Sequence, residues 1–171
     1  MNQRLIRLAT PEDCDGVVEL IDGCLIEYGD RICITEGGSE ADVLDVDAGY
    51  RAKGGEFWVL ESIEEGVSHI LGTHAARPAV NNPNEICTFK RLYLHKSLRG
   101  SHWGRDLMQV TIDWARDSGF KRIEFWSDTR FERAHRFFQK FNFQKTGDIR
   151  HMTDSAAPYS EYFFFLELDD C

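Results

Sequence analysis

Two kinds of apolar pattern alternate along this sequence. Stripes of apolar residues at helical spacing predict helices over residues 11–29, 103–119 and 131–141. The capping pattern Ser39-Glu40-Ala41-Asp42 predicts one more helix, strongly acidic, that ends near Tyr50. Short apolar runs bounded by turn residues predict strands at residues 5–8, 57–60, 67–75, 86–94, 123–126, 143–146 and 162–168.

The order of these segments indicates the fold class. Three consecutive strands form an antiparallel meander, which leads into a strand-helix-strand crossover that should be right-handed and parallel. The sequence therefore predicts a mixed α/β (α+β) fold, with a mostly antiparallel sheet of about six to seven strands flanked by about four helices.

Length and composition limit the number of domains. The chain has 171 residues, of which 42% are hydrophobic and 12 are phenylalanine, enough for one substantial core. It contains no internal repeat, low-complexity tract or linker-like segment. We therefore expect a single domain over residues 1–171.

The charge distribution argues against general nucleic-acid binding. The formal net charge is −9, and residues 1–65 hold 16 acidic against 5 basic side chains, while the rest of the chain holds 13 against 15. Such an acidic segment is often only a solvated helix surface, but it could also attract a cationic ligand. We therefore predict no nucleic-acid partner.

Several other features bear on location and metal binding. No apolar run is long enough to span a bilayer and the N-terminus lacks a secretory pattern, so we expect a cytoplasmic protein with no membrane partner. The five cysteines are odd in number and lack CxxC spacing, which favours reduced thiols. The six histidines are scattered, and no metal site is predicted.

The most informative local motif is a glycine-containing turn before the helix that begins near residue 103. It reads Arg99-Gly100-Ser101-His102-Trp103-Gly104 and follows the strand that ends Leu92-Tyr93-Leu94. Free N–H groups at a helix N-terminus, together with an arginine fork and small residues, form a site suited to phosphate. A glycine turn alone is weakly specific, because most such turns are plain connections.

Two motifs together resemble the GNAT acetyltransferases. The family's cofactor loop reads Arg/Gln-x-x-Gly-x-Gly/Ala, and its late helix ends Ala-x-x-Phe-Tyr-x-Lys-x-Gly-Phe; the corresponding segments here are residues 99–104 and 134–143. The resemblance implies a GNAT-like fold, acetyl-CoA as co-substrate and acetyl transfer to an amine by direct attack. It also implies that the main chain of Leu92, Tyr93 and Leu94 binds the pantetheine arm and that residues Arg99 to Gly104 bind the pyrophosphate.

The sequence departs from the family pattern at three positions. His102 stands where the family prefers glycine, and Asn142 replaces the glycine that follows the late helix. Phe138 occupies the place of a tyrosine that often protonates the leaving thiolate in the family, and a phenyl ring cannot donate that proton. These departures support an alternative function, a catalytically weak CoA-binding sensor or partner domain.

Candidates for the general base and for acceptor binding follow only from their positions in the sequence. Asp128 and Glu85 are the catalytic candidates, with Asp128 first because it lies at a strand-to-helix turn. Glu27 and Tyr28 are candidates for acceptor binding, although Tyr28 could equally pack in the core. The acidic N-terminal part favours a cationic small-molecule or peptide amine as acceptor, and the apolar strand near residue 163 makes a homodimer plausible.

Overall fold

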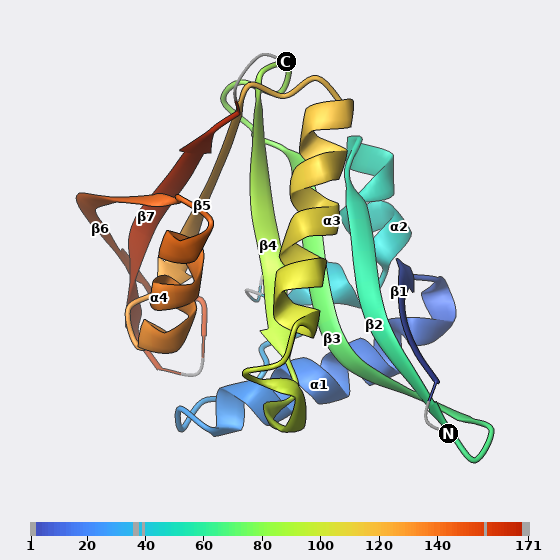
Figure 1. Ribbon diagram of the computed structural model, residues 1–171. Helices are drawn as coiled ribbons and strands as arrows, with labels where there is room; N and C mark the ends of the chain where they lie inside the picture. Colours follow the sequence, from blue (N-terminus) through green and yellow to red (C-terminus); the bar gives the residue numbers. More distant parts are fainter. Residues whose placement is uncertain (1–2, 36–37, 39, 156, 169–171) are drawn as a thin grey trace.

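A seven-stranded sheet forms the centre of the computed structural model, which describes residues 3–35, 38, 40–155 and 157–168 (Figure 1). The strands are β1 Gln3–Leu8, β2 Glu56–Glu64, β3 Val67–Pro78, β4 Ile86–Leu94, β5 Arg122–Asp128, β6 Gln144–Met152 and β7 Tyr159–Glu167. The α-helices are α1 Cys14–Ile26, α2 Val46–Gly49, α3 Trp103–Asp117 and α4 Glu132–Lys140. The predicted fold class is confirmed.

The sheet is antiparallel except at its middle. Its order is β1-β2-β3-β4-β5-β7-β6, and β4 and β5 form the parallel pair predicted for the crossover. These two strands pair over only three residues each, Ile86 to Thr88 with Arg122 to Glu124. Beyond that point they diverge toward the bottom of Figure 1, and the sheet opens there.

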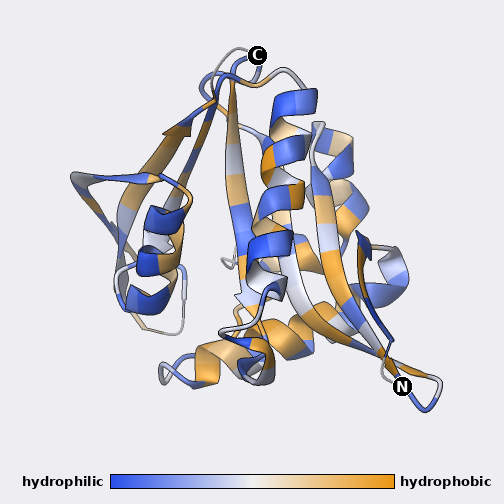
Figure 2. Ribbon diagram, viewed as in Figure 1, coloured by the Kyte–Doolittle hydropathy of each residue, from blue (hydrophilic) through white to orange (hydrophobic). Residues whose placement is uncertain are grey.

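Two apolar clusters cover the two faces of the sheet. Along β2, Phe57 and Val59 belong to the cluster under α1 and α2, whereas Trp58 and Leu60 belong to the cluster under α3 and α4. Successive side chains of a strand point to opposite faces, so a strand covered on both sides is apolar at every position. Figure 2 shows this apolar band along β2, between α3 on one face and α1 and α2 on the other.

The predicted ends of the helices are confirmed in part. Thr10 precedes α1 as expected, and its N–H donates to the Asp13 carboxylate at 2.7 Å. Gly29 and Asn142 have the positive φ values expected at helix ends. The continuous acidic helix predicted after Ser39, a residue outside the described part of the chain, is wrong: Asp45 caps the separate short helix α2, and 3-10 turns lie on both sides.

A histidine buried beneath α3 gives the fold a specific sensitivity to acid. Burial lowers the pKa of His74 to about 4. In the unfolded chain a histidine titrates near pH 6.5, so between these values the unfolded state binds a proton that the folded state does not. We therefore expect His74 to remove roughly 3 kcal/mol of stability between about pH 6.5 and pH 4, at about 1.4 kcal/mol per pH unit.

Urea unfolding of the wild type and of His74→Gln, at pH 7 and pH 4.5, measures this contribution. The free energy of unfolding should fall less steeply with acid in the variant. His69→Gln is the matched control, because His69 is exposed on the same strand. Equal slopes for wild type and His74→Gln would contradict the assignment.

Candidate functional site

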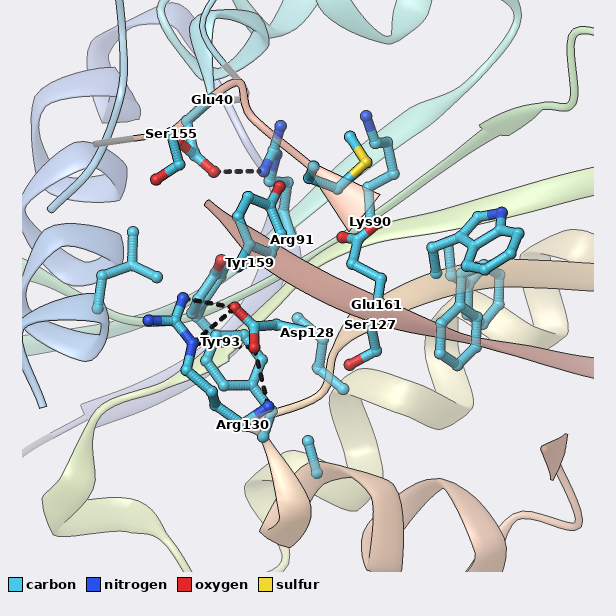
Figure 3. A pocket seen from close by; sticks show the side chains of 18 of the residues that line it. Glu40, Lys90, Arg91, Tyr93, Ser127, Asp128, Arg130, Ser155, Tyr159 and Glu161 are labelled. Carbon is cyan, nitrogen blue, oxygen red and sulfur yellow. Dashed lines mark hydrogen bonds and ion pairs between the residues drawn. The ribbon is translucent and has the colours of Figure 1, made fainter. Parts of the chain in front are cut away.

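A cleft opens where β4 and β5 diverge. It encloses about 200 Å³ and is lined by side chains from α1, α4 and strands β3 to β7 (Figure 3). Its wall on β4 includes the four consecutive residues Lys90, Arg91, Leu92 and Tyr93. In a regular strand successive side chains alternate between faces, and Leu92 and Tyr93 do pack with different apolar clusters, whereas the neighbours Lys90 and Arg91 both reach Asp42.

A bulge in β4 places Lys90 and Arg91 on the same side of the strand. Lys90 pairs with Ala75 and Tyr93 with Thr73, so the β4 segment between these pairs is one residue longer than the β3 segment opposite it. Arg91 has a φ of 59°, and the Thr73 hydroxyl donates to its carbonyl oxygen at 2.7 Å. Bulges of this kind bend a strand and redirect side chains, and here they bring neighbouring charged residues into one cleft.

Arg91 is the centre of a buried ion-pair network. Its guanidinium binds Asp42 Oδ1 through Nη2 at 2.7 Å and lies 3.5 Å from Glu40. The Tyr50 hydroxyl donates to the other Asp42 oxygen at 2.7 Å. Burial works against ionisation of Asp42, but the charges of Arg91 and Lys90 outweigh it and lower the pKa of the carboxyl group. The network therefore fixes the acidic segment before α2 against the bulge.

Asp128, the first sequence-based candidate for a base, lines the cleft but is strongly paired. Arg130 donates to both of its oxygens, with Nη2 2.6 Å from Oδ2, and the Arg130 backbone N–H donates to Oδ1 at 2.8 Å. The same guanidinium reaches Asp30 Oδ2 at 2.9 Å. Figure 3 shows Arg130 directed at Asp128. These bonds occupy both carboxylate oxygens.

Glu161 is a carboxylate of the cleft that the sequence did not indicate. It lies on β7 directly across from Asp128 on β5. Burial raises the pKa of Glu161, and the ion pair with Arg150 offsets this only in part. A cleft carboxyl group with a raised pKa has a property that a general base needs.

Phe138 also lines the cleft, at the position where the family resemblance placed a proton-donating tyrosine. It packs against Phe125 and Phe164, with ring centroids 4.8 and 5.3 Å away. Nearby, Ser127 Oγ lies 3.2 Å from His135 Nε2, and burial lowers the pKa of this histidine. Ser127 and Phe138 both line the cleft, so a hydroxyl group hydrogen-bonded to an imidazole is present in the same cleft as the phenyl ring.

The predicted cofactor loop lies at the N-terminus of α3. Gly100 has a φ of 83°, which a glycine adopts without strain, and a Cβ there would meet no atom within 4 Å. At Gly104 a Cβ would meet Leu94 at 3.5 Å, an ordinary contact. The His102 side chain is about half exposed and its ring packs on Trp103, 4.5 Å between centroids. The turn is therefore open around the Cα atom of Gly100.

Arg99 forms an ion pair with Glu27 that the sequence did not predict. Its two terminal nitrogens each lie 2.6 Å from an oxygen of Glu27, and its Nε donates to the Leu94 carbonyl at 3.2 Å. The ion pair places Glu27 beside the predicted cofactor loop, and Glu27 does not line the cleft. The acidic residue predicted to bind the acceptor therefore contacts the arginine predicted to bind pyrophosphate.

The remaining sequence-based candidates lie at or outside the margin of the cleft. Tyr28 contacts Phe131, a lining residue, with ring centroids 4.7 Å apart. Glu85 precedes β4, whereas the cleft residues of that strand begin at Phe89, and its carboxylate accepts from Asn82 at 2.9 Å. The structure does not bring Glu85 to the cleft.

Two further observations concern metals and membranes. Within the described residues, no three histidine, cysteine or acidic side chains come together as a group able to hold a metal ion. Among the helices of the described part of the chain, none has the length and apolarity that crossing a membrane requires.

Comparison with known proteins gives matches to acetyltransferases. The model of the acetyltransferase (GNAT) family matches residues 26–143. The uncharacterized N-acetyltransferase YjgM of Escherichia coli is 22% identical over 142 residues, covering 82% of this chain and 81% of its own. N-acetyltransferase family 8 member 2 of Rattus norvegicus is 29% identical over 111 residues, which are 63% of this chain. The matched region spans about half, 47%, of the rat protein.

Solved structures share the fold. A GNAT-family acetyltransferase from Staphylococcus aureus superposes with a TM-score of 0.78 at 18% identity, covering 98% of this chain and 100% of its own. The yncA protein from Salmonella typhimurium, solved with its cofactor acetyl-CoA, has a TM-score of 0.71 at 17% identity, covering 98% and 95%. At these identities the similarity concerns the arrangement of helices and strands.

Proposed function

The chain belongs to the acetyltransferase (GNAT) family, and on this premise we propose that it moves an acetyl group from acetyl-CoA to a primary amine. The supporting observation is the course of β4: its residues Phe89 to Tyr93 line the cleft, and the strand ends at Leu94, shortly before the Arg99 turn at the start of α3. A co-substrate held at the turn would reach the cleft along β4. Acetyl-CoA supplies the activated acetyl group as a thioester.

The residues of the turn fit a pyrophosphate group. A helix of 15 residues begins at Trp103, and the positive end of its dipole favours an anion there. Arg99 adds a guanidinium fork, and Gly100 leaves its surroundings free of side-chain atoms. We assign Arg99 to Gly104 to the pyrophosphate and the main chain of Leu92, Tyr93 and Leu94 to the pantetheine arm.

We assign Glu161 the role of general base. An amine must lose its proton to attack a thioester, and Glu161 Oε1 or a water bound to it can accept that proton within the cleft. Arg130 already occupies both oxygens of Asp128, so we assign this residue no proton transfer and retain it as the electrostatic partner of the ammonium form. Direct transfer in a ternary complex follows from placing co-substrate and amine in one cleft.

A CoA-binding sensor is the second candidate function. Phe138, at the place where a tyrosine would donate a proton, is the observation that favours it. The Ser127 hydroxyl group lines the same cleft and is hydrogen-bonded to His135, so it can donate the proton that Phe138 cannot, and for that reason we prefer the enzyme. Thiol release from acetyl-CoA with a panel of amines distinguishes the two functions.

The cofactor site has a direct test in the Arg99→Ala variant. Removing a charge-assisted bond of this kind costs about 1.5–3 kcal/mol, so the Kd for acetyl-CoA should rise about 10- to 100-fold in calorimetric titration. Glu27→Gln is the matched control, because it breaks the Arg99 ion pair and keeps the guanidinium. If Arg99 serves only to hold Glu27, both variants will bind acetyl-CoA equally weakly, and the assignment will be wrong.

A further inference from the structure

The charges inside the cleft differ from those of the sequence as a whole. Four basic residues and five acidic residues line it, so charges of the two signs nearly balance. Three of the basic residues have close carboxylate partners: Arg91 with Asp42, Arg130 with Asp128, and Arg150 with Glu161. The fourth, Lys90, differs from them.

Lys90 makes one long ion pair with the described residues. Its Nζ lies 3.8 Å from Asp42 Oδ2, an oxygen that already accepts the Tyr50 hydroxyl at 2.7 Å. The other Asp42 oxygen binds Arg91. Asp42 is therefore shared among three partners, and its charge is directed mainly at Arg91.

The surroundings of Lys90 stabilise its charge poorly. Burial and the neighbouring positive charge of Arg91 lower the pKa of Lys90 to about 8. Its side chain is still 32% exposed, and it lies on the wall of the cleft (Figure 3). An ammonium group in this position can be stabilised by a negative group arriving from the cleft.

We propose that Lys90 binds an acidic group of the acceptor, so that the acceptor is a small amine that also carries a carboxylate, an amino acid in chemical class. This inference rests on the proposed acetyl transfer. The acidic N-terminal part of the sequence favoured a cationic acceptor, but most of its acidic side chains do not line the cleft. Of these, Glu27 is paired with Arg99. The inferred acceptor is therefore zwitterionic instead of purely cationic.

The opposite wall suits the amine end. Asp128 and Glu161 face each other across β5 and β7, and Lys90 lies on β4, on the other side of the gap between β4 and β5. A zwitterion can place its ammonium group toward the two carboxylates and its carboxylate toward Lys90. Each charge of the ligand then meets its opposite.

The test compares each common L-amino acid with its amide, which has the same amine and side chain and lacks only the negative charge. Initial rates of thiol release give kcat/KM for both. We expect the best acceptors to be acids preferred over their amides by about 10- to 100-fold, mainly through KM. In Lys90→Gln this ratio should collapse toward one, and Lys90→Arg should restore part of it. Lys140→Gln, on the exposed face of α4, is the matched control.

Three results would overturn the inference. Acids and amides could be equally good acceptors, Lys90→Gln could lower both rates equally, or mass spectrometry could find Lys90 itself acetylated. If no amine is acetylated, the proposed function fails, and the subsite is judged by thermal denaturation with CoA present. In that measurement, amino acids must stabilise the wild type more than their amides do, and Lys90→Gln must lose the difference; any other result rejects the subsite.

Discussion

Replacing Glu161 with glutamine is expected to lower kcat/KM for acetyl transfer about 100- to 10,000-fold, the usual contribution of a general base. Burial raises the pKa of Glu161, so the wild-type rate should climb with pH through a raised carboxyl pKa and then level off. Glutamine keeps the shape and cannot accept the proton. The variant should therefore lose both the rate and this acidic limb of the pH-rate profile.

Two other carboxylates provide the comparison. Glu167 lies on the same strand and pairs with Arg122 at 2.7 Å, away from the cleft, so Glu167→Gln should leave the profile unchanged. Asp128→Asn should reduce the rate while keeping the acidic limb, because Asp128 is assigned an electrostatic role. If Asp128→Asn removes the limb and Glu161→Gln keeps it, the base is Asp128, as the sequence first suggested.

Replacing Arg91 with methionine is expected to lower the free energy of unfolding by about 3–5 kcal/mol, the cost of breaking a buried ion pair from one side. The Arg91 side chain is only 8% exposed, and its removal leaves the buried Asp42 carboxylate facing Lys90 at 3.8 Å and the Tyr50 hydroxyl. Urea unfolding at neutral pH measures the change, with the far-UV spectrum as a check that the fold persists.

An exposed ion pair calibrates this result. Arg31 binds Asp22 at 2.8 Å, but its side chain is 69% exposed, so Arg31→Met should cost at most about 1 kcal/mol. Adding Asp42→Asn to Arg91→Met should recover part of the lost stability, because the unpaired charge is then absent. A loss below about 1 kcal/mol for Arg91→Met would show that the network contributes no more than a surface pair.

The sequence predicted helices and strands well where the signal is local. The spacing of apolar residues identified α1, α3, α4 and each strand of the sheet, because amphipathic periodicity reflects which face of an element is covered. It failed after residue 39, where a capping pattern predicted one helix and the structure has separate short turns around α2. There Asp45 provides a cap of its own, which interrupts the run.

The predicted cofactor turn and the charged groups of the cleft differ in how far the sequence could predict them. Arg99 to Gly104 is a contiguous motif, so its residues are near one another in any fold. Glu161 and Lys90 carry no local signal: one is a charged residue in an apolar strand, and the other follows a phenylalanine in the meander. Glu85, which the sequence did suggest, lies at the wrong end of β4.

The sequence by itself determined most of the elements, their order and the turn at the start of α3, because these depend on interactions between residues close along the chain. Only the tertiary structure decided which distant side chains share the cleft. The β4 bulge turns Lys90 and Arg91 to the same side, and the insertion of β7 between β5 and β6 sets Glu161 opposite Asp128. Strand register and sheet order are long-range properties, and a shift of one residue would turn each of these side chains to the other face.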